Sequence, residues 1–291
     1  MNKRVVLIGP GRLGQAIGRL LAEAGYDIRA VISRDQGRAV EAARFIGFRH
    51  AATTELARAA EGELVLIALP DDQIGEMAAT LRRGGHLAAG SVLVHFSGLH
   101  PASIMLGEQG PPLGALAIHP LQTFADAVMG VRNLPGSPCS VEGAAELLPL
   151  AEQFVEDLGG TPFRIAAECK PLYHAAACFT SNYLVSLVAA ACEMLCGCGL
   201  EKAEATRLLL PLLTGTCHNL SVLGPEQALT GPIARGDQRT VGKHLQALGQ
   251  MPADLGEIYR VLGRKTVEVA QRKGTIDPQK AADLLKLLAD Q

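Results

Sequence analysis

The pattern of hydrophobic and polar positions changes character a little beyond the middle of the chain. Up to about residue 165, short apolar runs alternate with segments in which apolar residues recur every three or four positions, as in a helix packed on one side. The predicted strands cover 5–8, 27–33, 48–51, 64–69, 91–96, 113–118, 136–141 and 161–165, and the predicted helices 13–24, 36–46, 53–60 and 144–158. This alternation predicts an α/β domain with a doubly wound sheet.

Beyond residue 168 only helical spacing remains. Helices are predicted over 170–196, over 202–213 with a perturbation at Pro211, over 240–248 with Asp237 as N-cap, over 253–272 and over 278–289. The most apolar stretch, 175–194, carries several polar residues, so we interpret it as a buried helix rich in small residues and not as a membrane span. The expected fold is α/β and then all-α, with one domain over 1–166 and a helical domain over 167–291.

The first predicted strand ends in a glycine loop that opens a helix. The loop reads Gly9-Pro10-Gly11-Arg12-Leu13-Gly14, which fits the G-x-G-x-x-G pattern. Its first glycine permits a tight turn, its second lets a pyrophosphate approach the backbone, and its third lets the helix pack closely on the sheet. This predicts a dinucleotide site of the Rossmann type, with Ala68, Leu69 and Pro70 against the cofactor. A merely structural strand, turn and helix is the alternative.

The end of the second predicted strand indicates which dinucleotide is bound. NAD enzymes place an acidic residue there to bind the ribose, whereas this chain reads Ser33-Arg34-Asp35. Ser33 can bond to a 2′-phosphate and Arg34 can pair with it, so we expect NADP(H). In the alternative, Arg34 is a solvated charge and Asp35 caps the next helix. Asp71 and Asp72, after the fourth predicted strand, are expected to be helix caps.

Composition indicates which kinds of binding partner and which cellular compartment to expect. The 291 residues carry a net charge of −2 and only 4% aromatic residues, without a basic patch, which argues against nucleic acid. The chain enters its first predicted strand at once, with no signal-peptide core, and its seven cysteines are an odd number, so we expect reduced thiols in the cytoplasm. Cys192, Cys196 and Cys198 lack C-x-x-C spacing and are interpreted as core residues, with no metal site expected.

Three further motifs are distinctive. They are His119-Pro120-Leu121-Gln122-Thr123-Phe124, Tyr173-His174-Ala175-Ala176-Ala177 and Leu229-Thr230-Gly231-Pro232-Ile233-Ala234-Arg235-Gly236-Asp237. With the glycine loop and the helical second half, the chain resembles the 6-phosphogluconate dehydrogenase-like superfamily, which includes β-hydroxyacid dehydrogenases, prephenate dehydrogenase and pyrroline carboxylate reductase. Closer still, it resembles a bacterial family of Rossmann-like proteins with a helical C-terminal domain of unknown function, usually named NADP oxidoreductases. The resemblance implies the fold, NADP and a dimer, but no substrate.

The resemblance also implies catalytic residues. β-Hydroxyacid dehydrogenases carry Lys-x-x-x-Asn at the start of their long helix, where this chain has Lys170 and, four residues on, His174. Prephenate dehydrogenase has a His-Pro pair after the matching strand, and its histidine contacts the substrate hydroxyl. His119 takes that place here and is expected to exchange a proton near its ordinary pKa of about 6.5. Ser97 lies where a nicotinamide ring is expected.

These residues also have structural interpretations. Lys170 could be a solvated side chain at a helix start, and His119 could hold the turn before Pro120. Asn182, two turns beyond His174, could extend the same helix face or satisfy a polar contact in the core.

The sequence therefore predicts an NADP(H)-dependent oxidoreductase acting on a small carbonyl, hydroxy or imine metabolite in the cleft between its domains. A non-catalytic sensor or regulatory protein that retains the site, or an enzyme of another class that uses a different nucleotide, are the alternatives. The run 170–196 is too apolar for a helix with a solvated side, so we expect a homodimer through the C-terminal helices.

Overall fold

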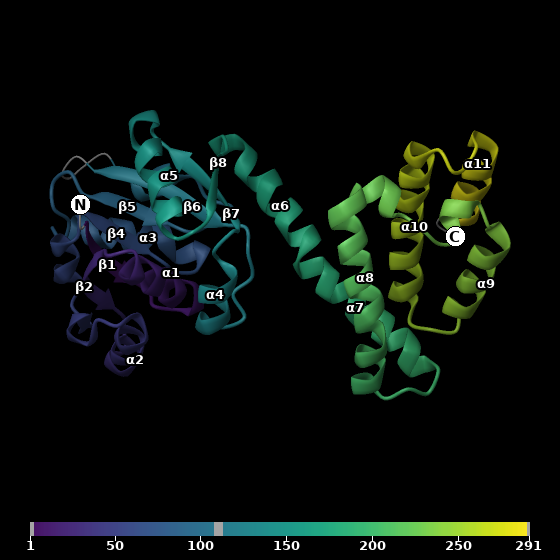
Figure 1. Cartoon of the computed structure of the whole chain (residues 1–291), viewed down its shortest axis with the longest axis horizontal. Helices are drawn as coiled ribbons and strands as arrows, with labels where there is room; N and C mark the ends of the chain where they lie inside the picture. Colours follow the sequence, from purple (N-terminus) through teal and green to yellow (C-terminus); the bar gives the residue numbers. More distant parts are fainter. Residues whose placement is uncertain (1–2, 108–112, 290–291) are drawn as a thin grey trace. The chain divides into compact units, whose positions relative to one another are not determined.

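The computed structural model describes residues 3–107 and 113–289 (Figure 1). The chain divides into two compact units, Met1–Ser181 and Asn182–Gln291. The last strand of the sheet ends at Arg164, near the domain boundary expected at residue 166, whereas the units part only after Ser181. The helix between these two points belongs to the first unit, and it carries several of the predicted site residues.

The first unit is built on one eight-stranded sheet (Figure 1). The strands are β1 (Arg4–Ile8), β2 (Asp27–Ile32), β3 (Ala52–Thr53), β4 (Leu64–Ile67), β5 (Val92–His95), β6 (Gly114–Pro120), β7 (Pro138–Gly143) and β8 (Thr161–Arg164). They lie in the order β3-β2-β1-β4-β5-β6-β7-β8, and all neighbours are parallel except the antiparallel pair β6 and β7. Together with the helical second unit, this order confirms the expected α/β and then all-α fold.

Both faces of the sheet are buried, which explains why its strands are apolar without a break. Along β1, Val5 and Leu7 join one hydrophobic core and Val6 and Ile8 the other, because successive side chains point to opposite faces. The helices of this unit are α1 (Arg12–Glu23), α2 (Gln36–Ile46), α3 (Asp71–Arg83), α4 (Ala127–Asn133), α5 (Leu148–Asp157) and α6 (Lys170–Thr180). Short 3-10 helices span Arg49–Ala51, Leu56–Glu61, Ala102–Met105, Ala145–Leu147 and Ala167–Cys169.

The segment after α2 differs from the prediction. The expected strand over 48–51 is mostly the 3-10 helix Arg49–Ala51, and β3 has only two residues, Ala52 and Thr53, paired with the end of β2. The expected helix over 53–60 is the 3-10 helix Leu56–Glu61. These segments are too short for periodicity to identify them.

The second unit is helical. Its helices are α7 (Asn182–Gly197), α8 (Lys202–Ala228), α9 (Gln238–Leu248), α10 (Ala253–Lys273) and α11 (Pro278–Leu287), with a 3-10 helix over Ile233–Arg235. The side chain of Asp237 caps α9 as predicted, by accepting a hydrogen bond from the Thr240 N–H. The predicted helix over 170–196 is interrupted at Ser181, and α8 runs through Pro211 as far as a break at Gly224, whose φ is +73°. Pro225 explains that break, because proline disfavours a helical conformation in the residue before it.

The expectation of a buried apolar helix over 175–194 is wrong for the single chain. The stretch Ala167–Gly197 is long and apolar enough to cross a membrane, by length and composition only, and 11% of its most apolar window is buried. That finding is weak evidence for a membrane span. Large apolar side chains are exposed on α6 and α7 (Leu172, Phe179, Tyr183, Val185, Leu187) and on α8 (Leu208, Leu210, Leu212, Leu220, Val222, Leu223).

Candidate active site

The glycine loop leaves space for a dinucleotide. Gly9 has a φ of +82°, and a Cβ added there would lie 2.8 Å from the carbonyl oxygen of Ala68. A Cβ on Gly14 would lie 2.8 Å from the carbonyl oxygen of Gly9, so only glycine lets α1 pack this closely on the loop. A Cβ on Gly11 would meet nothing within 4 Å, which leaves open space where a pyrophosphate would approach.

A cavity of about 820 Å³ begins at this loop, at the C-terminal ends of β1, β2 and β4. Its lining includes the predicted cofactor residues Gly9, Pro10, Gly11, Ser33, Arg34, Ala68, Leu69 and Pro70. The other three predicted residues lie outside the lining: Arg12 is exposed, Leu13 packs against the core and Gly14 is buried. Ligands bind at this edge of doubly wound sheets, and the volume suits a nucleotide.

Two arginines line the same cavity, Arg34 and Arg38. Over residues 3–107 and 113–289, no carboxylate forms an ion pair with either of them. Asp35 is the N-cap of α2, where its Oδ1 accepts a hydrogen bond of 2.8 Å from the Arg38 N–H, so the alternative interpretation of Asp35 is confirmed. Arg38 is missing from the predicted set. A second basic residue one helical turn beyond Arg34 is the signal that could have found it.

The two aspartates after β4 are not caps. Pro70 is the N-cap residue of α3, and Asp71 and Asp72 occupy the first turn without a side-chain capping bond. The prediction fails because Pro70, with φ −54° and ψ 149°, starts the helix one residue earlier. In the first turn the carboxylates still interact favourably with the positive end of the helix dipole.

The strand register brings Ser97 and His119 to the same level of the sheet edge. Ile67, His95 and Ala117 are paired across β4, β5 and β6, and the two site residues each follow two positions later. Neighbouring strands are about 4.8 Å apart, so His119 lies roughly 10 Å from the end of β4 along this edge. The nucleotide cavity and His119 therefore belong to one edge of one sheet.

Two imidazoles and a phenol meet at this edge. His119 Nδ1 lies 2.8 Å from the hydroxyl of Tyr173, and the two rings are 5.5 Å apart at 88°. The rings of His119 and His174 are 5.9 Å apart at 87°. A Cβ added to Gly98 would lie 3.0 Å from His119 Nε2 and 2.7 Å from His174 Nδ1, and no described residue bonds to that buried Nδ1. Gly98 thus leaves room for both rings.

Lys170, the first residue of α6, is completely buried. Its Nζ donates a hydrogen bond of 3.1 Å to the carbonyl oxygen of Ser97, and in the described part of the chain it has no carboxylate within ion-pair distance. Burial lowers the pKa of the Lys170 ammonium, while Glu142 and Asp71 raise it. The solvated alternative for Lys170 is therefore wrong, and the side chain faces the loop after β5.

Ser97 and His95 organise that loop. The Ser97 hydroxyl accepts hydrogen bonds of 3.0 Å from the N–H groups of Leu99 and His100. His95 Nδ1 accepts from the Ser97 N–H at 3.1 Å, so its Nε2 carries the hydrogen and donates to the Pro101 carbonyl oxygen at 3.2 Å. His95 was not predicted from the sequence. A histidine that ends an otherwise apolar strand is the signal for it.

Burial lowers the pKa of His119 to about 4, and the neighbouring His174 and Lys170 act in the same direction. This corrects the expectation of a pKa near 6.5. At neutral pH the His119 imidazole is uncharged, so it can donate or accept a hydrogen bond.

Comparison with known families matches both parts of the chain. Residues 4–97 match the family described as NADP oxidoreductase, coenzyme F420-dependent, and residues 137–266 match a domain of unknown function. Over residues 4–97 the chain is therefore similar to NADP oxidoreductases. The first matched region holds the glycine loop and Ser97, and the second holds Lys170 and His174. His119 lies between the two.

Solved structures are similar to most of the chain. The chain is 28% identical to a Bacteroides fragilis protein provisionally named an NADP oxidoreductase, with a TM-score of 0.72 over 92% of this chain and 98% of that one. A Thermotoga maritima protein is 27% identical, with a TM-score of 0.69 over 92% and 100%. The Plasmodium falciparum pyrroline carboxylate reductase with NADP bound is 12% identical, with a TM-score of 0.59 over 99% of each chain, and shares the fold. No curated protein matches.

The remaining predicted residues belong to the second unit. Asn182 is the first residue of α7, in the second unit. Cys192 is buried beside Thr206, whereas Cys196 and Cys198 are exposed, so the core interpretation fails for the last two. In the part of the chain that the structure describes, no group of three or more His, Cys, Asp or Glu residues could hold a metal ion.

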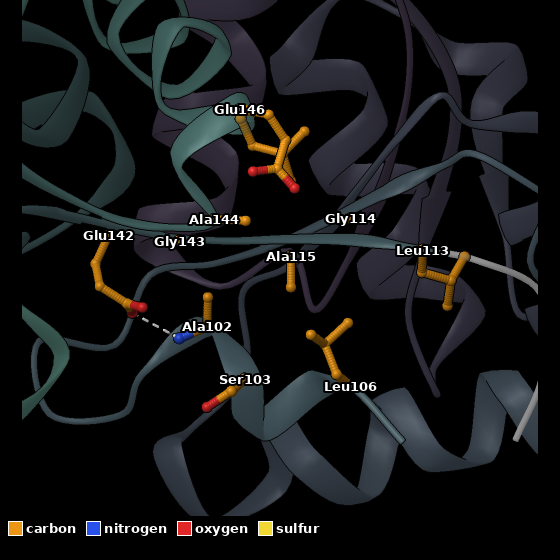
Figure 2. Close-up of a pocket in the computed structure, with 11 residues that line it drawn as sticks. Ala102, Ser103, Leu106, Leu113, Gly114, Ala115, Glu142, Gly143, Ala144 and Glu146 are labelled. Carbon is orange, nitrogen blue, oxygen red and sulfur yellow. Dashed lines mark hydrogen bonds between the residues drawn. The ribbon is translucent and has the colours of Figure 1, made fainter. Parts of the chain in front are cut away.

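A second cavity, of about 460 Å³, lies at the opposite edge of the sheet, where β6 begins and β7 ends (Figure 2). Gly114 and Gly143 lie on its sheet side, and the Glu142 carboxylate accepts a hydrogen bond of 2.7 Å from the Ala102 N–H within it. None of the predicted site residues lines this cavity. The nucleotide loop and the histidines are both at the other edge.

Proposed function

We propose that the protein transfers a hydride between NADP(H) and a small carbonyl, hydroxy or imine compound at the C-terminal edge of its sheet. The observation that carries the proposal is the convergence of His119 Nε2 and His174 Nδ1 on Gly98, beside the buried Lys170. These groups share their sheet edge with the glycine loop and its cavity. A site that only sensed a nucleotide would have no need of a buried ammonium and two imidazoles here.

The residues present fit NADP(H). The open space at Gly11 suits the pyrophosphate, and Arg34 and Arg38 suit a 2′-phosphate. Bound NADP(H) supplies or accepts the hydride. The neutral His119 imidazole can hold a substrate oxygen or nitrogen by a hydrogen bond, and the Lys170 side chain is a second group that can exchange a proton.

The decisive experiment is a screen of NADPH oxidation and NADP⁺ reduction against aldehydes, ketones, cyclic imines and hydroxy acids. With the compound that reacts, His119→Ala, which removes the hydrogen-bond donor, should lower turnover by roughly 10²–10³-fold and change the NADPH dissociation constant by only a few-fold. If no compound of these classes reacts while NADPH still binds, the proposal fails and the sensor alternative takes its place.

We also propose that the protein is a homodimer joined by its C-terminal helices. The exposed apolar side chains of α7 and α8 support this, since an apolar patch of that extent is rarely left in water. Val185 and Leu212 are exposed by 71% and 70% in the single chain. A second copy would cover them through a two-fold interface.

A further inference from the structure

We infer that Tyr173 is a positioning residue for His119: its hydroxyl donates to Nδ1 and thereby keeps the imidazole hydrogen on Nε2, the nitrogen that faces Gly98. The inference deepens the proposed function, on which it rests. It makes His119 a hydrogen-bond donor toward the substrate and gives Tyr173 no contact with the substrate itself.

The direction of the hydrogen bond follows from the chemistry of the two groups. A neutral imidazole has one N–H and one lone pair, and its bare nitrogen is a much better acceptor than a phenol oxygen. The phenol O–H is also more acidic than the N–H of a neutral imidazole, so it is the better hydrogen-bond donor. Burial raises the pKa of Tyr173, so its hydroxyl keeps the hydrogen that it donates. The 2.8 Å contact is therefore O–H to nitrogen, and the imidazole hydrogen lies on Nε2.

Both ends of this hydrogen bond are held in place. The Tyr173 ring makes a T-shaped contact with His119 and another with Phe163 of β8, 5.9 Å away at 68°. His119 itself is part of strand β6, which fixes its backbone. A bond between two fixed groups favours one tautomer more strongly than a bond to a mobile side chain does, because it is formed all the time.

The surroundings of His119 favour the same outcome. The charged and titratable groups that act on it are Lys170 and His174 from α6, His95 from β5 and Asp71 from α3. Lys170 and His174 both disfavour the imidazolium, so His119 stays neutral and its two nitrogens keep different roles. Tyr173 decides which nitrogen has which role.

The test is ¹⁵N NMR of the full-length protein labelled at histidine, with His119→Asn used to assign the His119 signals among the eight histidines. In the wild type, Nδ1 should show the shift of a bare nitrogen and Nε2 that of an N–H. Tyr173→Phe keeps the ring and removes the donor, and should raise the Nδ1–H population several-fold. A wild-type hydrogen on Nδ1, or an unchanged spectrum in Tyr173→Phe, would overturn the inference.

The chain offers a matched control. Tyr259 in α10 bonds to His244 Nδ1 at 2.9 Å, with rings 5.8 Å apart at 90°, in the second unit. Tyr259→Phe removes the same kind of bond and should leave the His119 signals and the turnover unchanged. Tyr173→Phe should lower turnover by about tenfold without weakening NADPH binding. The NMR result needs no substrate, so failure of the proposed reaction would not be confused with failure of this inference. The wild-type spectrum alone shows which nitrogen carries the hydrogen, even if Tyr173→Phe does not fold.

Discussion

His95 links folding to pH through a single side chain. Burial lowers its pKa from 6.5 to about 4, so between these values the unfolded chain binds more protons than the folded one. The resulting stability is fully present above pH 6.5 and is lost as the pH falls toward 4. From pH 7 to pH 5 the loss due to His95 should be about 2 kcal/mol in the free energy of unfolding.

Urea unfolding at the two pH values tests this. His95→Asn keeps an acceptor oxygen for the Ser97 N–H and cannot titrate, so it should lose about 2 kcal/mol less than the wild type between pH 7 and pH 5. The loss of unfolding free energy due to His119 is the same in both proteins, so it cancels in the difference between them. Equal losses in wild type and variant would show that His95 does not stay neutral.

Arg34 is expected to distinguish the two nicotinamide cofactors. Its guanidinium can form charged hydrogen bonds to a 2′-phosphate, so Arg34→Ala should weaken NADPH binding by on the order of 1.5–3 kcal/mol and NADH binding little. Calorimetry with both cofactors measures this. Arg44→Ala, at an exposed position of α2 outside the cavity, is the control and should change neither affinity. Equal affinity of the wild type for both cofactors would contradict a 2′-phosphate site.

At the scale of elements, the sequence predicts best where periodicity and end signals agree. Helix α2 is found at its predicted bounds because Asp35 caps its start and Gly47, with φ +102°, ends it. Helix α8 passes through Pro211 as predicted, but it continues beyond the predicted end at residue 213, where no helix-ending signal stands before Gly224 and Pro225.

The candidate site could be predicted only in part for a similar reason. Its glycines and strand-end residues follow local rules. The bond from Lys170 to Ser97 joins residues 73 positions apart, and the pairing of Tyr173 with His119 spans 54 positions. Such contacts depend on where α6 lies against the sheet, and helical spacing alone contains no information on that.

Two glycines of the first turn should behave oppositely when replaced by alanine. Gly11→Ala meets no atom within 4 Å and keeps a negative φ, so the protein should fold with little change in melting temperature and bind NADPH at least roughly tenfold more weakly. Gly14→Ala meets the Gly9 carbonyl at 2.8 Å and should lower the melting temperature itself. Thermal unfolding and NADPH titration of both variants separate the two effects. Tight NADPH binding by Gly11→Ala would contradict the proposed position of the pyrophosphate.

At the scale of the whole molecule, we expect a dimer of about 61 kDa, twice the 30.6 kDa of one chain. Light scattering at micromolar concentration should give that mass. The double variant Val185→Glu, Leu212→Glu should give a monomer, because burying two carboxylates in an apolar interface is costly. Val128→Glu, at an exposed site in the first unit, should keep the dimer mass. A wild-type mass of about 31 kDa would contradict the dimer.

The division of the chain after Ser181 also determines where a protease could cut and leave all residues of the candidate site in one fragment. A fragment that stopped at residue 166 would end near the last strand, yet it would lack Lys170, Tyr173 and His174, and would leave the Ser97 carbonyl and His119 Nδ1 without partners. A fragment that stopped at residue 181 would keep every one of them. Both should bind NADPH, but only the longer fragment should retain the wild-type tautomer of His119. The smallest fragment that contains the whole candidate site is therefore the nucleotide-binding sheet together with α6, a helix that sequence patterning assigns to the other domain.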